Sequence, residues 1–141
     1  MDIRILLYQG SVFSIEWYYD EKGRSPAREF FLALNDDRKA AMLALAKRLG
    51  ETGQIRDITK FRNEGDKIFA FKPQPERFLG FFFSGHKVII TNGFQKKSDK
   101  MPPGEKDRAL RAKMNYETRV KQGIYYEDLK KIQKWLRRIC F

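Results

Sequence analysis

The sequence has only one cysteine and one histidine, and this scarcity excludes several kinds of site. Cys140 alone cannot form a disulfide framework or a cysteine-rich metal site within the chain, which fits a reducing cytoplasm. His86 lies in a predicted turn, so we do not expect it to be the catalytic acid or base. The chemistry must therefore come from other side chains.

Long hydrophobic runs and acidic residues are also scarce. No apolar run approaches the roughly 20 residues that span a membrane, and Asp2 and Arg4 interrupt an N-terminal run too short for a signal peptide. We therefore expect a cytoplasmic protein with no membrane partner. The 18 acidic residues face 29 Lys and Arg, a formal net charge of +11. This excess favours an anionic partner, first of all nucleic acid, because aromatic residues are interleaved with the charge; the alternative is solubility alone.

The sequence does contain enough hydrophobic residues to form a packed core. Hydrophobic residues make up 42% of the 141 residues and aromatic residues 14%, which predicts a packed domain, with room for one appended element. Residues 1–10 form either a short strand or a leader outside the fold. Residues 12–19 alternate, with Phe13, Ile15 and Trp17 on one side, which predicts a strand.

Two helices are predicted next. Ser25 supplies an N-cap hydroxyl, and Pro26 suits the first helical position. A second helix follows a cap at Asp36 or Asp37 and is predicted to end at Gly50. Because the link between them is short, the sequence predicts an antiparallel helix hairpin whose apolar faces need a sheet to cover them.

Residues 67–97 contain three apolar runs rich in Phe, Ile and Val, which favour strands. Turn signals at 73–76 and 84–87 join them into a three-stranded antiparallel meander. The second strand, 78–83, is apolar on both faces, which predicts a central position covered on both sides. Upstream, 60–62 is either a short strand or a basic loop that feeds the site.

Two helices close the chain, at 104–119 and from 125 onward. In the last one, apolar residues recur four and three apart, surrounded by Lys and Arg, at Tyr125, Leu129, Ile132, Leu136 and Ile139. This helix packs on its own domain, forms a homodimer with a second copy, or touches an anionic surface. The predicted fold is α+β: an N-terminal strand and antiparallel helix hairpin packed on a small antiparallel sheet, with C-terminal helices. We expect a domain at 1–120 and a basic amphipathic helical extension at 121–141.

Basic residues lie at the strand ends of the meander. Lys72 closes its first strand, Arg77 opens its second, and Lys96 and Lys97 follow its third. Because the end of each strand in a meander lies beside the start of the next, these side chains converge into a cationic cluster that suits a phosphate. The alternative is that strand-end charge only protects the sheet from aggregation.

Several further motifs lie between residues 76 and 116. They are Glu76-Arg77-Phe78-Leu79, the strand and paired lysines of Val88-Ile89-Ile90-Thr91-Asn92-Gly93-Phe94-Gln95-Lys96-Lys97, the proline-led segment 98–103 with Glu105, Ala109 and Arg111, and Asn115-Tyr116. In these motifs the chain resembles the RelE/ParE superfamily of bacterial toxins, and within it the phage-derived HigB-like branch. The resemblance covers about residues 13–119.

The resemblance implies the toxin component of a type II toxin–antitoxin system. It implies a metal-independent endoribonuclease without a cofactor, which cuts messenger RNA on the ribosome and is neutralised by a small cognate antitoxin. RNA can use its own 2′-hydroxyl as the nucleophile, so such a protein needs only a base near that hydroxyl and cations around the phosphate.

The resemblance also implies roles for particular residues. The candidate catalytic residues are Arg77, Lys72, Lys96 and Tyr116, and the candidate RNA-binding residues are Lys60, Arg62 and Lys97. Tyr116 is alternatively a core residue of its helix. The sequence departs from the family at Ala70-Phe71-Lys72, where relatives often have Glu, a hydrophobic residue and Arg. The acid is missing, and lysine cannot make a bidentate phosphate contact.

This departure keeps a second hypothesis open. A non-enzymatic phage-derived inhibitor on the same fold, such as a gyrase poison or another binding module, needs no catalytic base. A third hypothesis, a basic DNA-binding module, has no recognition-helix motif to support it.

Overall fold

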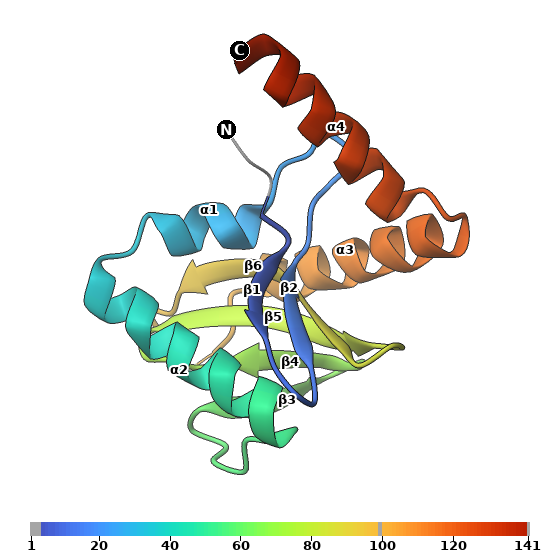
Figure 1. Cartoon of the computed structure of the whole chain (residues 1–141). Helices are drawn as coiled ribbons and strands as arrows, with labels where there is room; N and C mark the ends of the chain where they lie inside the picture. Colours follow the sequence, from blue (N-terminus) through green and yellow to red (C-terminus); the bar gives the residue numbers. More distant parts are fainter. Residues whose placement is uncertain (1–3, 99, 141) are drawn as a thin grey trace.

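The computed structural model describes residues 4–98 and 100–140 (Figure 1). Met1 to Ile3, the start of the N-terminal run, lie outside the described residues, as do Asp99 and Phe141. The elements are β1 (Leu6–Gln9), β2 (Ser14–Trp17), α1 (Pro26–Leu32), α2 (Asp36–Thr52), β3 (Phe61–Gly65), β4 (Ile68–Phe71), β5 (Glu76–Phe83), β6 (Lys87–Gln95), α3 (Pro103–Lys121) and α4 (Tyr125–Cys140). The predicted α+β class is confirmed.

The strands form one open sheet in the order β1-β2-β6-β5-β4-β3. All neighbours are antiparallel except β2 and β6, which are parallel. β5 lies between β6 and β4, and its residues Phe78 and Leu79, which point to opposite faces, are both fully buried. The predicted central position of this strand is confirmed.

Two segments that the sequence left open are strands. Part of the N-terminal run forms β1, which pairs with β2. Residues 61–65 form β3, which adds a fourth strand to the predicted meander. The β3–β4 turn passes through Gly65, Asp66 and Lys67, all with positive φ. β2 is shorter than the predicted strand 12–19.

The first helix begins as predicted, and the second differs at both ends. The Ser25 hydroxyl accepts a hydrogen bond from the backbone N–H of Arg28 at 3.3 Å. Asn35, not Asp36 or Asp37, caps α2, since its side-chain oxygen accepts from the N–H of Arg38 at 3.0 Å. The two aspartates lie in the first turn, where they suit the helix dipole.

The predicted end of α2 at Gly50 is wrong. The helix continues to Thr52, and Gly53 ends it in the left-handed conformation with φ of 82°. Gly50 lies inside the helix because the β1–β2 connection packs directly on it. Its carbonyl accepts from the N–H groups of Val12 and Phe13, at 2.8 and 3.0 Å, and a Cβ there would lie 2.8 Å from the Tyr8 ring.

The helices cover both faces of the sheet. α1 packs mainly on β6, and α2 on β1. On this face the ring of Phe78 contacts Phe30 and Phe31 of α1. On the other face Tyr116 of α3 contacts Phe81, three residues further along β5. The result is a helix–sheet–helix arrangement with an aromatic core. No helix within residues 4–98 and 100–140 is both long enough and apolar enough to cross a membrane.

Candidate functional site

A pocket of about 230 Å³ opens at the end of the sheet, beside the start of α3. It is lined by Arg62, Glu64, Ala70, Lys72, Arg77, Phe94, Lys96, Lys100 and Met101. Arg77 lies on the same face of β5 as Leu79 and Phe81, because side chains alternate along a strand. The pocket therefore opens on the face that α3 covers further along. We refer to it as the cationic pocket.

Strand pairing explains the convergence of the cations. Arg77 lies opposite Phe94 in the β5–β6 pair, and Arg62 lies opposite Ala70 in the β3–β4 pair. The N–H of Lys96 donates to the carbonyl of Pro75 at 3.0 Å, which brings the end of β6 to the β4–β5 turn. The structure thus brings Lys72, Arg77 and Lys96 into one pocket, as the meander geometry predicts. Their catalytic roles stay a prediction.

Hydrogen bonds to backbone carbonyls hold two of these cations. The Arg77 Nη1 donates to the carbonyl of Glu76 at 2.9 Å. The Lys72 Nζ donates to the carbonyl of Ile58 at 3.2 Å. Each side chain keeps further donors, so both can still bind an anion.

Burial and repulsion from the other cations of the pocket lower the pKa of Lys72. Burial lowers the pKa of Lys72 below its ordinary value, and the charges of Arg77 and Lys96 lower it further. Arg62 acts in the same direction, while Glu64 opposes the shift. A bound phosphate would offset this mutual repulsion, so the pocket is electrostatically prepared for an anion.

Burial also lowers the pKa of Arg77, against the opposing charges of Glu64 and Glu76. A guanidinium nevertheless stays protonated at any physiological pH. Arg77 therefore provides a permanent positive charge, whereas Lys72 can release a proton more readily than an ordinary lysine.

Glu64 is the most important of the pocket residues that the sequence did not predict. The sequence lacks an acid at Ala70, and the structure supplies one from the neighbouring strand: Glu64 lines the pocket, partly exposed, two residues after Arg62. The signal was the spacing of Arg62 and Glu64, two positions apart in a segment that can be a strand. In the structure the β3–β4 register shifts between Asn63 and Gly65, and both side chains line the pocket. Lys100 and Met101, in the connection before α3, were missed as well.

A second pocket of about 270 Å³ adjoins the first. Arg77 and Lys96 line both pockets, and Lys97, Ser98 and the turn residues Gln74 and Pro75 complete the second. The two pockets therefore form one continuous cationic surface. Lys97 lines only the second pocket, and its predicted RNA-binding role stays a prediction.

Tyr116 lines neither pocket, and its predicted catalytic role stays a prediction. Its side chain is fully buried, and its hydroxyl lies 2.6 Å from that of Tyr126. Burial raises the pKa of Tyr116 to about 12. The alternative reading, a core residue, describes its position, because the aromatic rings of Phe81 and Phe83 cover it.

Two further residues lie outside both pockets. Lys60 lines neither of them, although its carbonyl accepts from the N–H of Lys72 at 2.7 Å. His86 lies in the β5–β6 turn with φ of 59°, at the opposite end of β5 from Arg77. Its predicted position in a turn is confirmed, and it lines neither pocket.

Comparison with known proteins bears on this site. Residues 29–114 match the model of a family described as "Phage derived protein Gp49-like (DUF891)". The matched segment contains 86 of the 141 residues and every residue of the cationic pocket. No curated protein matches the chain significantly.

Proposed function

The chain belongs to the phage-derived Gp49-like family, which is part of the RelE/ParE-like toxin superfamily, and we propose that it is the toxin of a type II toxin–antitoxin pair that cleaves RNA. The observation that carries this proposal is the cationic pocket. Its lining combines the cations Arg62, Lys72, Arg77 and Lys96 with one carboxylate, that of Glu64. This is the set of groups that cleavage by the RNA's own 2′-hydroxyl requires.

In the proposed mechanism the Glu64 carboxylate accepts the proton of the 2′-hydroxyl. The 2′-oxygen attacks the adjacent phosphorus, and the bond from phosphorus to the 5′-oxygen breaks. The Lys72 ammonium donates a proton to that leaving oxygen, a role that its lowered pKa favours. Arg77 and Lys96 stabilise the negative charge that grows on the phosphoryl oxygens. The products are a 2′,3′-cyclic phosphate and a 5′-hydroxyl.

The residues around the pocket suit a longer RNA. Lys97 on one side and Arg62 and Lys100 on the other lie where the preceding and following phosphates would run. We further propose that the chain belongs to the HigB-like branch, that its substrate is messenger RNA on the ribosome, and that a small antitoxin neutralises it. The net charge of +11 supports an RNA partner.

The mechanism can be tested with two substrates and one variant. The purified protein is incubated with RNA, alone and on translating ribosomes, and with the same RNA carrying 2′-O-methyl groups. We expect cuts that leave 2′,3′-cyclic phosphates, none in the methylated RNA, and a rate about 100-fold lower for Glu64→Gln. Equal cleavage of the methylated RNA would exclude this mechanism. If unmethylated RNA stays intact both alone and on translating ribosomes, the non-enzymatic inhibitor is supported instead.

The lowered pKa of Lys72 predicts how the cleavage rate depends on pH. Its ammonium loses its proton as the pH rises through a pKa below the ordinary 10.5, so the cleavage rate should fall on the alkaline side earlier than for an ordinary lysine. In Lys72→Arg this alkaline fall should vanish, because the guanidinium keeps its charge. The rate at neutral pH should be lower, because arginine is a poor acid. The measurement is the initial rate against pH, with uncatalysed RNA hydrolysis subtracted; identical alkaline profiles would assign the titration to another group.

A further inference from the structure

Helix α4 is held firmly at its first two turns. Tyr125 and Leu129 are buried. The Tyr126 hydroxyl donates to the carboxylate of Glu16 at 2.7 Å, and Asp128 lies 3.9 Å from the buried guanidinium of Arg119. These contacts fix the direction in which the rest of the helix leaves the body (Figure 1).

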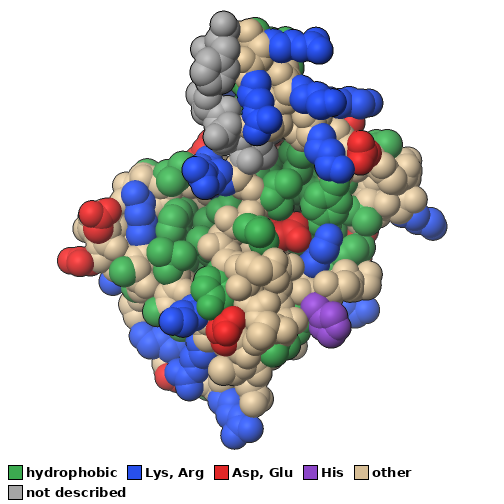
Figure 2. Space-filling model, viewed as in Figure 1, with side chains coloured by type: hydrophobic (Ala, Val, Ile, Leu, Met, Phe, Trp, Pro, Cys, Tyr) green, Lys and Arg blue, Asp and Glu red, His purple; other side chains and the backbone are tan. Residues whose placement is uncertain are grey.

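Beyond Leu129 the helix is strongly basic. Its exposed cations are Lys130, Lys131, Lys134, Arg137 and Arg138, and residues 129–140 contain no acid. Figure 2 shows their blue side chains gathered at the top of the molecule. The Lys130 Nζ lies 3.3 Å from the carboxylate of Glu127, one of the two acids that precede this stretch. The charge is therefore concentrated on the part of the helix that projects from the body (Figure 1).

A groove of about 460 Å³ lies between this helix and the N-terminal segment. The half-buried Ile5 and the aliphatic stems of the lining lysines provide its apolar surface, and Leu129 lies buried beneath them. Its polar lining comes from Glu127, Lys130, Lys131, Gln133, Lys134 and Arg137. The groove thus combines apolar side chains with a border of cations.

The groove is separate from the cationic pocket. The Lys87 Nζ lies 3.0 Å from the Tyr126 hydroxyl, which places the base of α4 at the β5–β6 turn. Arg77 lies six residues back along β5 from Phe83, or roughly 20 Å at the rise of a strand. Moreover, α4 lies outside residues 29–114, the segment that matches the family.

We propose that this groove binds an acidic, amphipathic peptide segment of a partner protein. Apolar side chains of that segment would cover Ile5 and the lysine stems beside it, and its carboxylates would face Lys130, Lys134 and Arg137. RNA fits less well, because the groove lining contains no aromatic ring on which a base could stack. A second copy of the chain would bring two clusters of like charge together. The proposal does not depend on RNA cleavage.

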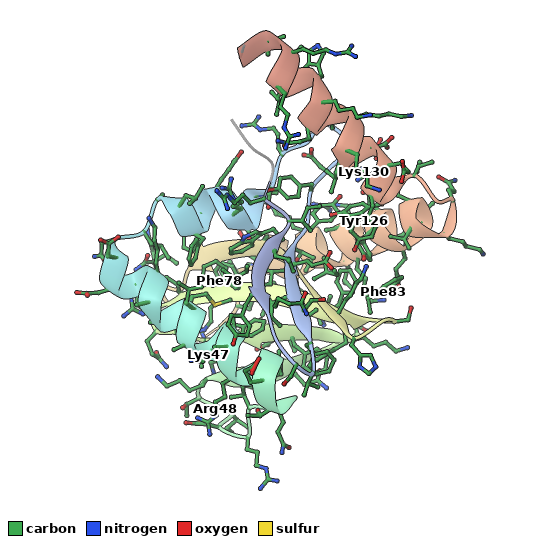
Figure 3. All side chains as sticks on the ribbon, in the orientation of Figure 1. Lys47, Arg48, Phe78, Phe83, Tyr126 and Lys130 are labelled. Atoms are coloured by element: carbon green, nitrogen blue, oxygen red, sulfur yellow. The ribbon has the colours of Figure 1, made fainter. Side chains whose placement is uncertain are left out.

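The probe is a fluorescent peptide of about 14 residues, or four helical turns, made of Glu and Leu with the leucines on one face. A scrambled peptide of the same composition keeps the charge and loses the apolar face. The test variant is Lys134→Glu with Arg137→Glu. The matched control is Lys47→Glu with Arg48→Glu, which reverses the same charges on the exposed surface of α2 (Figure 3).

The amphipathic peptide should bind about tenfold more tightly than the scrambled one, as fluorescence anisotropy would show. The α4 variant should weaken this binding by about tenfold or more, and the α2 control by much less. Circular dichroism checks that both variants fold. Equal binding of the two peptides, equal losses in the two variants, or stronger α4-dependent binding of an RNA of the same length would overturn the proposal.

Discussion

Replacing Arg77 with alanine is expected to lower the rate of RNA cleavage by about two to three orders of magnitude, the usual effect of losing a donor that stabilises transition-state charge. Arg77 lines both pockets, so it lies beside both the reacting phosphate and its neighbour. The Arg77 side chain donates a hydrogen bond to the carbonyl of Glu76, a neighbour in the chain, and has no ion pair described among residues 4–98 and 100–140. The fold should therefore survive the change, as a denaturation curve would show.

Two further variants serve as comparisons: one keeps the charge at position 77 and changes its geometry, and the other is a control away from the pockets. Arg77→Lys keeps the charge and loses the planar fork, so its rate should lie between those of the wild type and the alanine variant. Arg48→Ala removes an exposed arginine of α2, away from the pockets, and should leave the rate unchanged. In bacteria without an antitoxin, Arg77→Ala should no longer arrest growth or cut messenger RNA. Full toxicity of that variant would mean that the site lies elsewhere.

The second large effect is on stability. Arg38, in the first turn of α2, donates from Nε and Nη2 to the carboxylate of Glu76 at 3.0 and 2.7 Å. It also donates to the carbonyls of Pro73, at 2.6 Å, and Gln74. The Glu76 side chain is only 3% exposed, so Arg38 provides the cation that compensates for the burial of its carboxylate. The pair fixes the turn that precedes Arg77.

Replacing Arg38 with methionine should lower the free energy of unfolding by about 3 kcal/mol, because it leaves a buried carboxylate without its cation. We expect the lower end of the usual range, since the Arg38 side chain is 31% exposed. The measurement is the urea midpoint with its slope. In the double variant Arg38→Met with Glu76→Leu most of the loss should be recovered, because no charge stays buried. Equal losses in the single and double variants would show that the ion pair is not the cause.

The sequence by itself determined the local features of this protein. The hydroxyl of Ser25 and the ring of Pro26 start α1 by their own chemistry. The apolar runs and turn signals of 67–97 determined the strands, and the connection of consecutive strands brought Lys72, Arg77 and Lys96 together. These features were predictable because they depend on neighbours in the chain or on a hairpin between adjacent strands.

Only the tertiary structure decided the rest. Glu64 joins the pocket because β3 pairs with β4, and Tyr116 is buried because α3 packs on β5. The Arg38–Glu76 pair joins residues 38 positions apart. Gly50 stays inside α2 because a distant connection packs on it. Such contacts form between segments that only the packed core brings together, so no local pattern of residues predicts them.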